Sequence, residues 1–254
     1  MLQAMFDLTG RKALVTGASK GLGYGMAEAL LEAGAEAVIV GSSDRVHSAA
    51  DTLAQSTGGN VHSIQSDLGK RDQLYQCFKD ALEILDRLDI LVVCHGIQRR
   101  SPAENFPLEQ WDEVLEVNLS SVFMLDQLAG QIMLPKGKGK IINVASLLSF
   151  SGGITVPAYA AAKAGVSRLT MSFANEWAGR GVNVNAIAPG YMDTELNTAL
   201  KADTNRYQAI TSRIPAGRWG TANDMKGITL LLASDASDYI NGVTIPVDGG
   251  WMGR

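Results

Sequence analysis

Cysteine and large clusters of one charge sign are scarce in this sequence. Its 254 residues include two cysteines, Cys77 and Cys94, which form no Cys-x-x-Cys pair. Such a composition fits a protein kept in a reducing compartment, so we expect a cytoplasmic location. The net charge is −4, and no basic run is interleaved with aromatic residues. We therefore expect no binding to nucleic acid.

Long apolar runs and metal-ligand spacings are also missing. No stretch approaches the roughly 20 apolar residues of a membrane span, and residues 1–12 lack the pattern of a secretory signal peptide. The histidines His47, His62 and His95 show no spacing typical of a metal site. Because linkers, low-complexity segments and repeats are absent as well, we expect a single domain over residues 1–254, without a membrane segment or a metal.

Apolar runs of strand length alternate with helical patterns along almost the whole chain. The first strand, glycine-rich turn, helix and second strand form a unit that favours parallel pairing and a right-handed crossover. Strands are predicted over residues 12–16, 36–40, 61–66, 89–94, 140–145, 182–188 and 243–247. Helices are predicted from the glycine-rich turn to residue 34 and over 72–85, 108–116, 119–133, 157–178 and 223–233. This alternation predicts an α/β fold of Rossmann type, a doubly wound parallel sheet of seven strands.

Three glycines, Gly17, Gly21 and Gly23, lie between the first strand and the first helix. Their spacing, G-x-x-x-G-x-G, differs from the G-x-G-x-x-G fingerprint but permits the same chemistry. Glycines let the backbone approach a pyrophosphate, and the start of the helix presents free N–H groups and the positive end of its dipole. A plain turn needs only one glycine, so the three together predict a dinucleotide site.

Three polar residues near the ends of predicted elements each allow two interpretations. Asp67 can accept a hydrogen bond from an adenine amino group or cap the following helix. His95 suits a catalytic base, although we favour a loop histidine with local hydrogen bonds. Asn118 is a poor residue for the middle of a helix, so it either caps a helix or makes a specific contact.

Ser146, Tyr159 and Lys163 form the strongest candidate site. Ser146 follows an apolar strand, and Tyr159 and Lys163 lie four residues apart on one face of the next helix. A phenol with an ordinary pKa of roughly 10 is a poor acid or base at neutral pH, and a nearby ammonium lowers that pKa. Because a serine hydroxyl can hold a carbonyl or alcohol oxygen, the three predict proton transfer at the carboxyl end of the sheet.

Together these motifs resemble the classical short-chain dehydrogenases/reductases over nearly the whole chain. The match includes the family's cofactor loop, adenine-side aspartate, catalytic tetrad, nicotinamide-carboxamide segment and C-terminal strand. These correspond to residues 16–23, to Asp67, to Asn118, Ser146, Tyr159 and Lys163, to Pro189-Gly190 with Thr194, and to residues 241–250. In this family the C-terminal strand usually packs in a tetramer interface, so the resemblance implies a homotetramer.

The resemblance implies an NAD(P)-dependent oxidoreductase that interconverts a secondary alcohol and a ketone. Tyr159 would give or take the hydroxyl proton, Lys163 would lower the Tyr159 pKa and hold the nicotinamide ribose, and Ser146 would orient the substrate oxygen. Asn118 would position a water in a proton relay through Lys163. Cofactor contacts are expected from Gly17, Ser19, Lys20, Gly21, Leu22, Gly23, Ser42, Ser43, Arg45, Asp67, Leu68, Gly96, Tyr159, Lys163, Pro189, Gly190 and Thr194.

One segment departs from the family pattern. The family usually has Asn-Ala-Gly after the fourth strand, and this chain has Cys94-His95-Gly96. Gly96 preserves the close approach to the cofactor, whereas the bracing amide of the asparagine is lost. We therefore expect an undisplaced fourth strand with different local hydrogen bonds.

The end of the second strand favours NADP(H) over NAD(H). NAD selection usually uses an acidic residue at this position, and here the position is occupied by Gly41. Lys20, Ser42, Ser43 and Arg45 offer cations and hydroxyls for a phosphate. In the alternative, the cations are solvated surface charges and Asp44 reaches the ribose of NAD(H).

The predicted substrate site is lined from three places: after Gly96, around residues 152–156, and by a substrate-binding segment at about 191–216. Arg99 and Arg100 suit the binding of a carboxylate. Taken without the rest of the sequence, the two arginines would favour a solvated basic loop. Substrate contacts are expected from Arg99, Arg100, Ser146, Leu148, Tyr159 and Tyr191.

Several segments are similar to the family branch of 2-dehydro-3-deoxy-D-gluconate 5-dehydrogenases, which implies a keto-deoxy sugar acid from uronate breakdown as the substrate. They are GIQRR, SLLSFSGGITVPAY, NEWA, NVNAIAPGYMDT and RIPAGRWG. The alternatives are a 3-oxoacyl-thioester reductase, whose acidic carrier the basic run KGKGK at 136–140 would help to dock, a gluconate 5-dehydrogenase-like enzyme, and a catalytically silent cofactor sensor.

Overall fold

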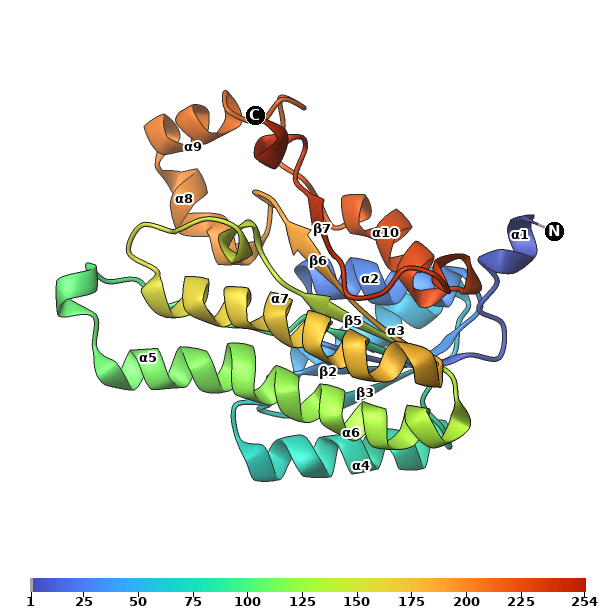
Figure 1. Ribbon diagram of the computed structural model, residues 1–254. Helices are drawn as coiled ribbons and strands as arrows, with labels where there is room; N and C mark the ends of the chain where they lie inside the picture. The colour runs from blue at the N-terminus through green and yellow to red at the C-terminus, as the bar shows by residue number, and fades with distance from the viewer. Residues whose placement is uncertain (1) are drawn as a thin grey trace.

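The computed structural model describes residues 2–254, in which seven parallel strands form one sheet in the order β3-β2-β1-β4-β5-β6-β7 (Figure 1). The strands are β1 (Lys12–Thr16), β2 (Glu36–Gly41), β3 (Val61–Gln65), β4 (Ile90–Val93), β5 (Gly139–Val144), β6 (Val182–Pro189) and β7 (Thr244–Val247). The predicted α/β fold of Rossmann type is thus confirmed, and each end of a predicted strand lies within one residue of its observed position.

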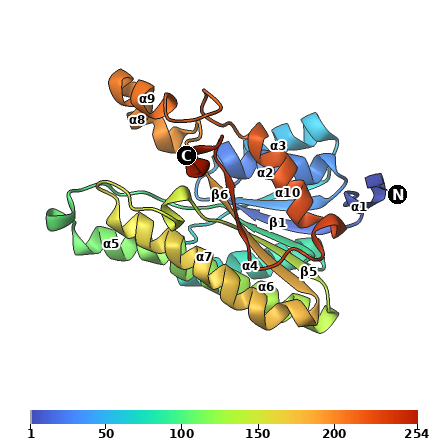
Figure 2. The same cartoon turned by 45° about the horizontal axis from the view of Figure 1, so that its top comes forward.

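Helices cover both faces of the sheet (Figure 2). They are α1 (Leu2–Met5), α2 (Gly21–Glu32), α3 (Arg45–Thr57), α4 (Arg71–Leu85), α5 (Leu108–Leu115), α6 (Ser121–Lys136), α7 (Pro157–Trp177), α8 (Thr198–Ala202), α9 (Thr204–Thr211) and α10 (Asn223–Ala233). Helices α2, α3 and α10 form one layer, and α4, α6 and α7 form the other, which α5 extends. Helices α8 and α9 lie beyond the carboxyl ends of the strands.

The alternation of side chains along buried strands explains the two layers. In β1, Leu14 packs into the apolar core beneath α4, α6 and α7, whereas Ala13 and Val15 pack into the core beneath α2, α3 and α10. Successive side chains of a strand point to opposite faces, so a strand buried on both faces is apolar throughout. These strands therefore read as unbroken apolar runs in the sequence.

Helix α3 is missing from the sequence-based prediction. It buries Val46, Ala49, Ala50 and Leu53, which have the spacing of one helical face. Two of these four residues are alanines and the remaining positions are mostly polar, so the apolar signal is weak. The segment 191–216, predicted to bind substrate, contains a 3-10 turn followed by α8 and α9.

The two helices predicted around Asn118 are joined without a break. Residues Glu116–Ser120 form a π-helical turn between α5 and α6. Asn118 lies in this turn, fully buried, and caps neither helix. Its amide instead bridges the backbone of Ile97, since Nδ2 donates to the Ile97 carbonyl (2.7 Å) and Oδ1 accepts from the Ile97 N–H (2.8 Å). The interpretation as a specific contact is therefore confirmed.

Strand β4 is not displaced by the Cys94-His95 sequence that follows it. It pairs in register with β1 and β5 over its whole length. The His95 ring lies between two hydroxyls, with Nδ1 2.8 Å from Thr16 Oγ1 and Nε2 2.7 Å from Ser121 Oγ. The expected change of local hydrogen bonds is confirmed.

No helix within residues 2–254 combines the length and the apolar character that crossing a membrane requires.

Candidate active site

A cleft of about 1410 Å³ runs along the carboxyl ends of the central strands and continues under the segment 191–216. That edge is where open α/β sheets bind ligands. Most residues predicted for cofactor or substrate line it: Gly17, Ser19, Lys20, Gly21, Leu22, Gly23, Ser42, Asp67, Leu68, Gly96, Arg99, Arg100, Ser146, Leu148, Tyr159, Lys163, Pro189, Gly190, Tyr191 and Thr194. Among the described residues, the predicted Ser43, Arg45 and Asn118 do not line the cleft.

The glycine-rich loop fits the backbone of a dinucleotide. A Cβ on Gly17 would lie 2.7 Å from the His95 backbone, and a Cβ on Gly23 would lie 2.4 Å from the Gly17 carbonyl oxygen. Gly17 and Gly21 also have positive φ angles of 66° and 60°, which side chains disfavour. Helix α2 starts at Gly21 without a side-chain cap, so its first N–H groups are free for an anion.

The end of β2 leaves little space for a side chain at residue 41. A Cβ on Gly41 would lie 3.0 Å from Ser19 Cβ and 3.1 Å from Val46 Cβ. Gly41 and Ser42 line the cleft with Lys20, whereas Asp44, the alternative ribose ligand, is not among the described residues that line it. This wall therefore offers a cation and a hydroxyl.

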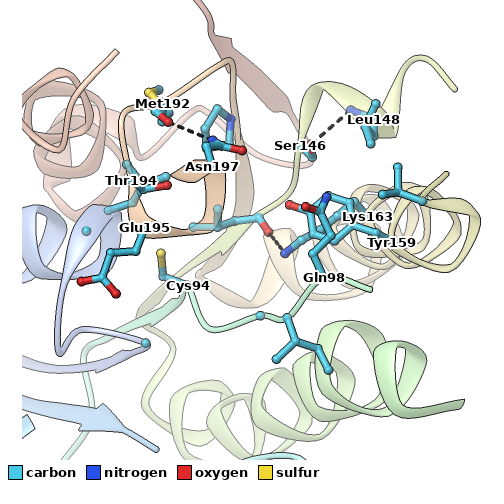
Figure 3. A pocket seen from close by; sticks show the side chains of 18 of the residues that line it. Cys94, Gln98, Ser146, Leu148, Tyr159, Lys163, Met192, Thr194, Glu195 and Asn197 are labelled. Atoms are coloured by element: carbon cyan, nitrogen blue, oxygen red, sulfur yellow. Dashed lines mark hydrogen bonds between the residues drawn. The ribbon is translucent and has the colours of Figure 1, made fainter. Parts of the chain in front are cut away.

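Ser146, Tyr159 and Lys163 converge at the middle of the cleft (Figure 3). Ser146 follows β5, where its Oγ accepts a hydrogen bond from the Leu148 N–H (3.2 Å). Helix α7 begins at Pro157, a residue suited to the first helical position, and presents Tyr159 and Lys163 one turn apart. The Lys163 Nζ donates to the Val144 carbonyl (2.7 Å) and lies 5.8 Å from the centre of the Tyr159 ring.

Burial governs the acidity of Tyr159 and Lys163. It raises the pKa of Tyr159 to about 12, and the Ser146 hydroxyl offsets part of this rise. Burial also lowers the pKa of Lys163 to about 8. Lys163 makes no contribution to the Tyr159 pKa in the structure, where its Nζ donates to the Val144 carbonyl, so lowering of the Tyr159 pKa by Lys163 stays a prediction. Ser146 and Arg100 are the groups that lower the Tyr159 pKa.

His95 is neutral in this site. Burial, followed by the nearby Lys163 charge, lowers its pKa to about 3. Both ring nitrogens face hydroxyls, so the ring holds the end of β4 against β1 and α6. The favoured interpretation as a locally bonded loop histidine is therefore confirmed.

Asp67 does not cap α4, whose first residue is preceded by Lys70. The Asp67 carboxylate accepts from the Gly69 N–H (3.1 Å) in a local turn and is half exposed at the cleft wall. The cap interpretation is therefore wrong.

Arg99 and Arg100, the two arginines after β4, differ in their hydrogen-bond partners. Arg99 forms a paired hydrogen bond with the Glu113 carboxylate (2.7 and 2.8 Å), so its charge is compensated. Arg100 bonds only to a neutral group, the Gln98 side chain (2.9 Å). Substrate contact by either arginine stays a prediction, and a contact by Arg99 would have to displace Glu113.

Comparisons with known proteins identify the family of the chain. A family model described as Enoyl-(Acyl carrier protein) reductase matches residues 17–252. The 2-dehydro-3-deoxy-D-gluconate 5-dehydrogenase of Bacillus subtilis (strain 168) is 49% identical over 255 residues, which cover 100% of this chain and 99% of the relative. The chain belongs to the short-chain dehydrogenase/reductase family. It is an oxidoreductase that acts on CH–OH groups.

Solved structures of other short-chain dehydrogenases/reductases have the same fold. A protein from Agrobacterium tumefaciens, crystallised with bound NADP, is 47% identical with a TM-score of 0.92, and the match covers 98% of this chain and 99% of that one. A gluconate 5-dehydrogenase from Burkholderia cenocepacia J2315, in complex with NADP and tartrate, is 36% identical with a TM-score of 0.95, and the match covers 100% of both chains.

Several cleft residues of this dehydrogenase/reductase were missed by sequence reasoning. They come from the segment after β6 and from the last residues of the chain: Asp193, Glu195, Asn197, Lys201, Arg206, Arg213, Trp251 and Arg254. An apolar cluster of Ile210, Ile214 and Trp219, with Tyr191 and Trp251 against it, holds this segment over the cleft. The segment as a whole was predicted to bind substrate, and the positive charge of residues 201–213 was a signal for its cations.

The basic run 136–140 does not lie near the active site. It includes the start of β5, at the edge of the sheet opposite the cleft. Lys138 is paired with Asp235 (3.1 Å), and the buried Lys140 is paired with Asp238 (2.8 Å). Its expected role in docking an acidic carrier beside the active site is therefore wrong.

Proposed function

We propose that this short-chain dehydrogenase/reductase interconverts a secondary alcohol and a ketone on a keto-deoxy sugar acid, with NADP(H) as its cofactor. One observation carries the proposal: the Ser146–Tyr159 pair shares a cleft with a glycine cradle on one side and the uncompensated Arg100 on the other. The name of the 49% identical relative supports the sugar acid. NADP bound in the similar structures supports the cofactor.

Each residue of the site has a separate role in this proposal. NADP(H), when bound by the loop from Gly17 to Gly23, supplies or accepts the hydride. Ser146 orients the substrate oxygen, and Tyr159 transfers a proton at its phenol oxygen. Lys163 would hold the nicotinamide ribose, and Asn118 fixes the backbone at Ile97, next to Gly96. Pro189, Gly190 and Thr194 line the cleft and would hold the nicotinamide carboxamide.

The cofactor preference follows from the wall at the end of β2. A carboxylate that would select NAD(H) by binding the ribose diol is replaced by Gly41, whose surroundings are tight for any side chain. Lys20 and Ser42 line the wall instead, with Arg45 close behind through its contact with Glu195. This set suits the additional phosphate of NADP(H).

The substrate carboxylate is assigned to Arg100, with Arg206 from the segment 191–216 beside it. Burial lowers the pKa of Arg100, and the nearby positive charge of Arg206 contributes to this lowering. Two guanidinium groups close enough to repel one another suit an anion placed between them. Tyr191 and Leu148 line the same part of the cleft.

A substrate panel tests the proposal. Keto-deoxy sugar acids, aldonates and 3-oxoacyl thioesters are offered with each cofactor, and the absorbance of the reduced nicotinamide is followed. We expect turnover of a sugar acid with NADP(H), and its loss in Tyr159→Phe. Arg100→Met should raise KM for the sugar acid by roughly tenfold or more, the value of a charge-assisted hydrogen bond.

The matched control is Arg99→Met, which removes an equal charge from a side chain already paired with Glu113. We expect its KM to change less than threefold. Faster turnover of oxoacyl thioesters than of any sugar acid would overturn the substrate assignment and favour the reductase alternative. An active wild type excludes the silent cofactor sensor.

We also propose that the enzyme works in the cytoplasm as a homotetramer. Two free cysteines fit a reducing compartment. Helices α6 and α7 leave Phe123 and Met171 partly exposed, and β7 is an edge strand of the sheet. Apolar side chains on a helix pair and an open strand edge are surfaces that a second copy can cover.

A further inference from the structure

A carboxylate from the substrate-binding segment contacts both cations expected to bind the cofactor phosphate. Glu195 lies in the 3-10 turn before α8, in the segment 191–216. Its Oε1 accepts from Arg45 Nη1 (2.8 Å), and its Oε2 accepts from Lys20 Nζ. Figure 3 shows the Glu195 carboxylate directed away from Tyr159 and Lys163. Glu195 therefore connects the cofactor wall to the substrate segment.

The three side chains form a small charged network at the rim of the cleft. Lys20 precedes α2, and Arg45 is the first residue of α3, so two separate elements present their cations to one carboxylate. Hydrogen bonds from Lys20, and then from Arg45, lower the pKa of Glu195, which is ionised at neutral pH. The two cations carry two positive charges and the carboxylate one negative charge, so the network still attracts an anion.

A phosphate and the Glu195 carboxylate compete for the same donors. A phosphate monoester carries nearly two negative charges at neutral pH. Placed on Lys20 and Arg45 beside Glu195, it would meet a like charge at hydrogen-bond distance, which is unfavourable. A ribose with a free 2′-hydroxyl brings no such charge. The competition thus affects the phosphorylated nucleotide only.

We propose that Glu195 is a cofactor-discriminating residue that occupies the 2′-phosphate site of the free enzyme and must leave it when NADP(H) binds. The proposal rests on the proposed use of NADP(H). Glu195, Lys20 and Arg45 side chains are 58%, 51% and 52% exposed. Ion pairs at such exposure are weak, so a phosphate dianion can displace the carboxylate. Displacement also releases the segment 191–216 from the glycine-rich loop, which couples cofactor binding to the substrate site.

Binding of two nucleotide fragments to the full chain tests the proposal. Adenosine 2′,5′-bisphosphate carries the additional phosphate, and adenosine 5′-monophosphate lacks it; calorimetry gives both Kd values. We expect Glu195→Gln to lower Kd for the bisphosphate by roughly threefold to tenfold, the value of two exposed ion pairs. Kd for the monophosphate should stay within twofold.

The matched control is Glu83→Gln, an exposed carboxylate on α4 that pairs with Lys79 and does not line the cleft. It should leave both Kd values unchanged. Amide hydrogen exchange provides a second readout. The bisphosphate should speed exchange over residues 193–202 in the wild type. In Glu195→Gln the same residues should exchange fast even when no bisphosphate is bound.

Three results would overturn the proposal. If Glu195→Gln changed the Kd values of both fragments equally, the substitution would affect the nucleotide site in general. Weaker binding of the bisphosphate in this variant would show that Glu195 supports the cofactor. Equal Kd values for the two fragments in both the wild type and Glu195→Gln would reject the NADP(H) assignment and the inference with it.

Discussion

At the scale of single residues, the core contains a carboxyl group that favours its protonated form in the folded chain. Asp126 on α6 is fully buried, and burial raises its pKa to about 8. Asn143 on β5 donates from Nδ2 to Asp126 Oδ2 (2.8 Å). Within residues 2–254, two buried side-chain oxygens lack a donor, Asp126 Oδ1 and Asn143 Oδ1. A proton on Asp126 would supply a donor at this pair.

This carboxyl group makes stability depend on pH. Between its ordinary pKa of 3.8 and its folded pKa of about 8, the folded chain holds a proton that the unfolded chain has lost. The free energy of unfolding therefore falls as pH rises through this window, by at most about 1.4 kcal/mol per pH unit. Asp126→Asn should remove this slope, because the amide is neutral at every pH and can pair with Asn143.

Urea unfolding of both proteins between pH 5 and pH 7.5 measures the effect. We expect the variant to gain stability relative to the wild type at each step toward higher pH. Asp51→Asn, at an exposed site on α3, is the control and should keep the wild-type slope. Parallel stability curves for the wild type and Asp126→Asn would show that Asp126 is ionised in the folded chain.

At the scale of elements, the π-helical turn between α5 and α6 places Asn118 against Ile97. Asn118→Ala would remove both hydrogen bonds and leave the Ile97 N–H and carbonyl without their partner. An unsatisfied buried group costs about 1–3 kcal/mol. We expect the free energy of unfolding, measured in urea, to fall by roughly 2–5 kcal/mol, and by less in Asn118→Asp, which keeps the acceptor.

The control for this prediction is Asn105→Ala, which changes an exposed asparagine in the loop between β4 and α5. A loss below about 0.5 kcal/mol in Asn118→Ala, within the range of ordinary surface substitutions, would contradict the bridging role.

Sequence patterns sufficed where burial on both faces or a short local spacing determines the structure. Buried parallel strands are apolar throughout, and Tyr159 and Lys163 meet because a helix brings residues four apart together. Helix α3 was missed because alanines and polar residues carry little periodic signal. Glu195 was missed because its partners lie 150 and 175 residues away, and no local pattern specifies such a pairing.

At the scale of the whole molecule, the proposed homotetramer requires two surfaces for self-association, and the sheet and its helices offer two candidates. One is the outer side of α6 and α7, where Phe123 stacks on Phe173 and remains 38% exposed. A hollow beside it is lined by Tyr75, Leu119 and Leu169, among others. The other is β7, whose outer edge has no strand paired to it within residues 2–254. Two different surfaces, each joining two copies, would build a closed tetramer.

A charge in the centre of one surface should therefore convert the tetramer to dimers and not to monomers. Phe123→Glu places a carboxylate among the apolar side chains of α6 and α7, so we expect dimers held by the β7 surface. The molar mass from light scattering should fall from four chains of 27.0 kDa to two. Ile84→Glu is the control, because Ile84 is 40% exposed on α4 but lies nine residues from Tyr75, on the other side of that helix. A wild type with the mass of one chain, or a tetrameric Phe123→Glu, would reject this surface, since a buried unpaired carboxylate is not tolerated at the centre of an interface.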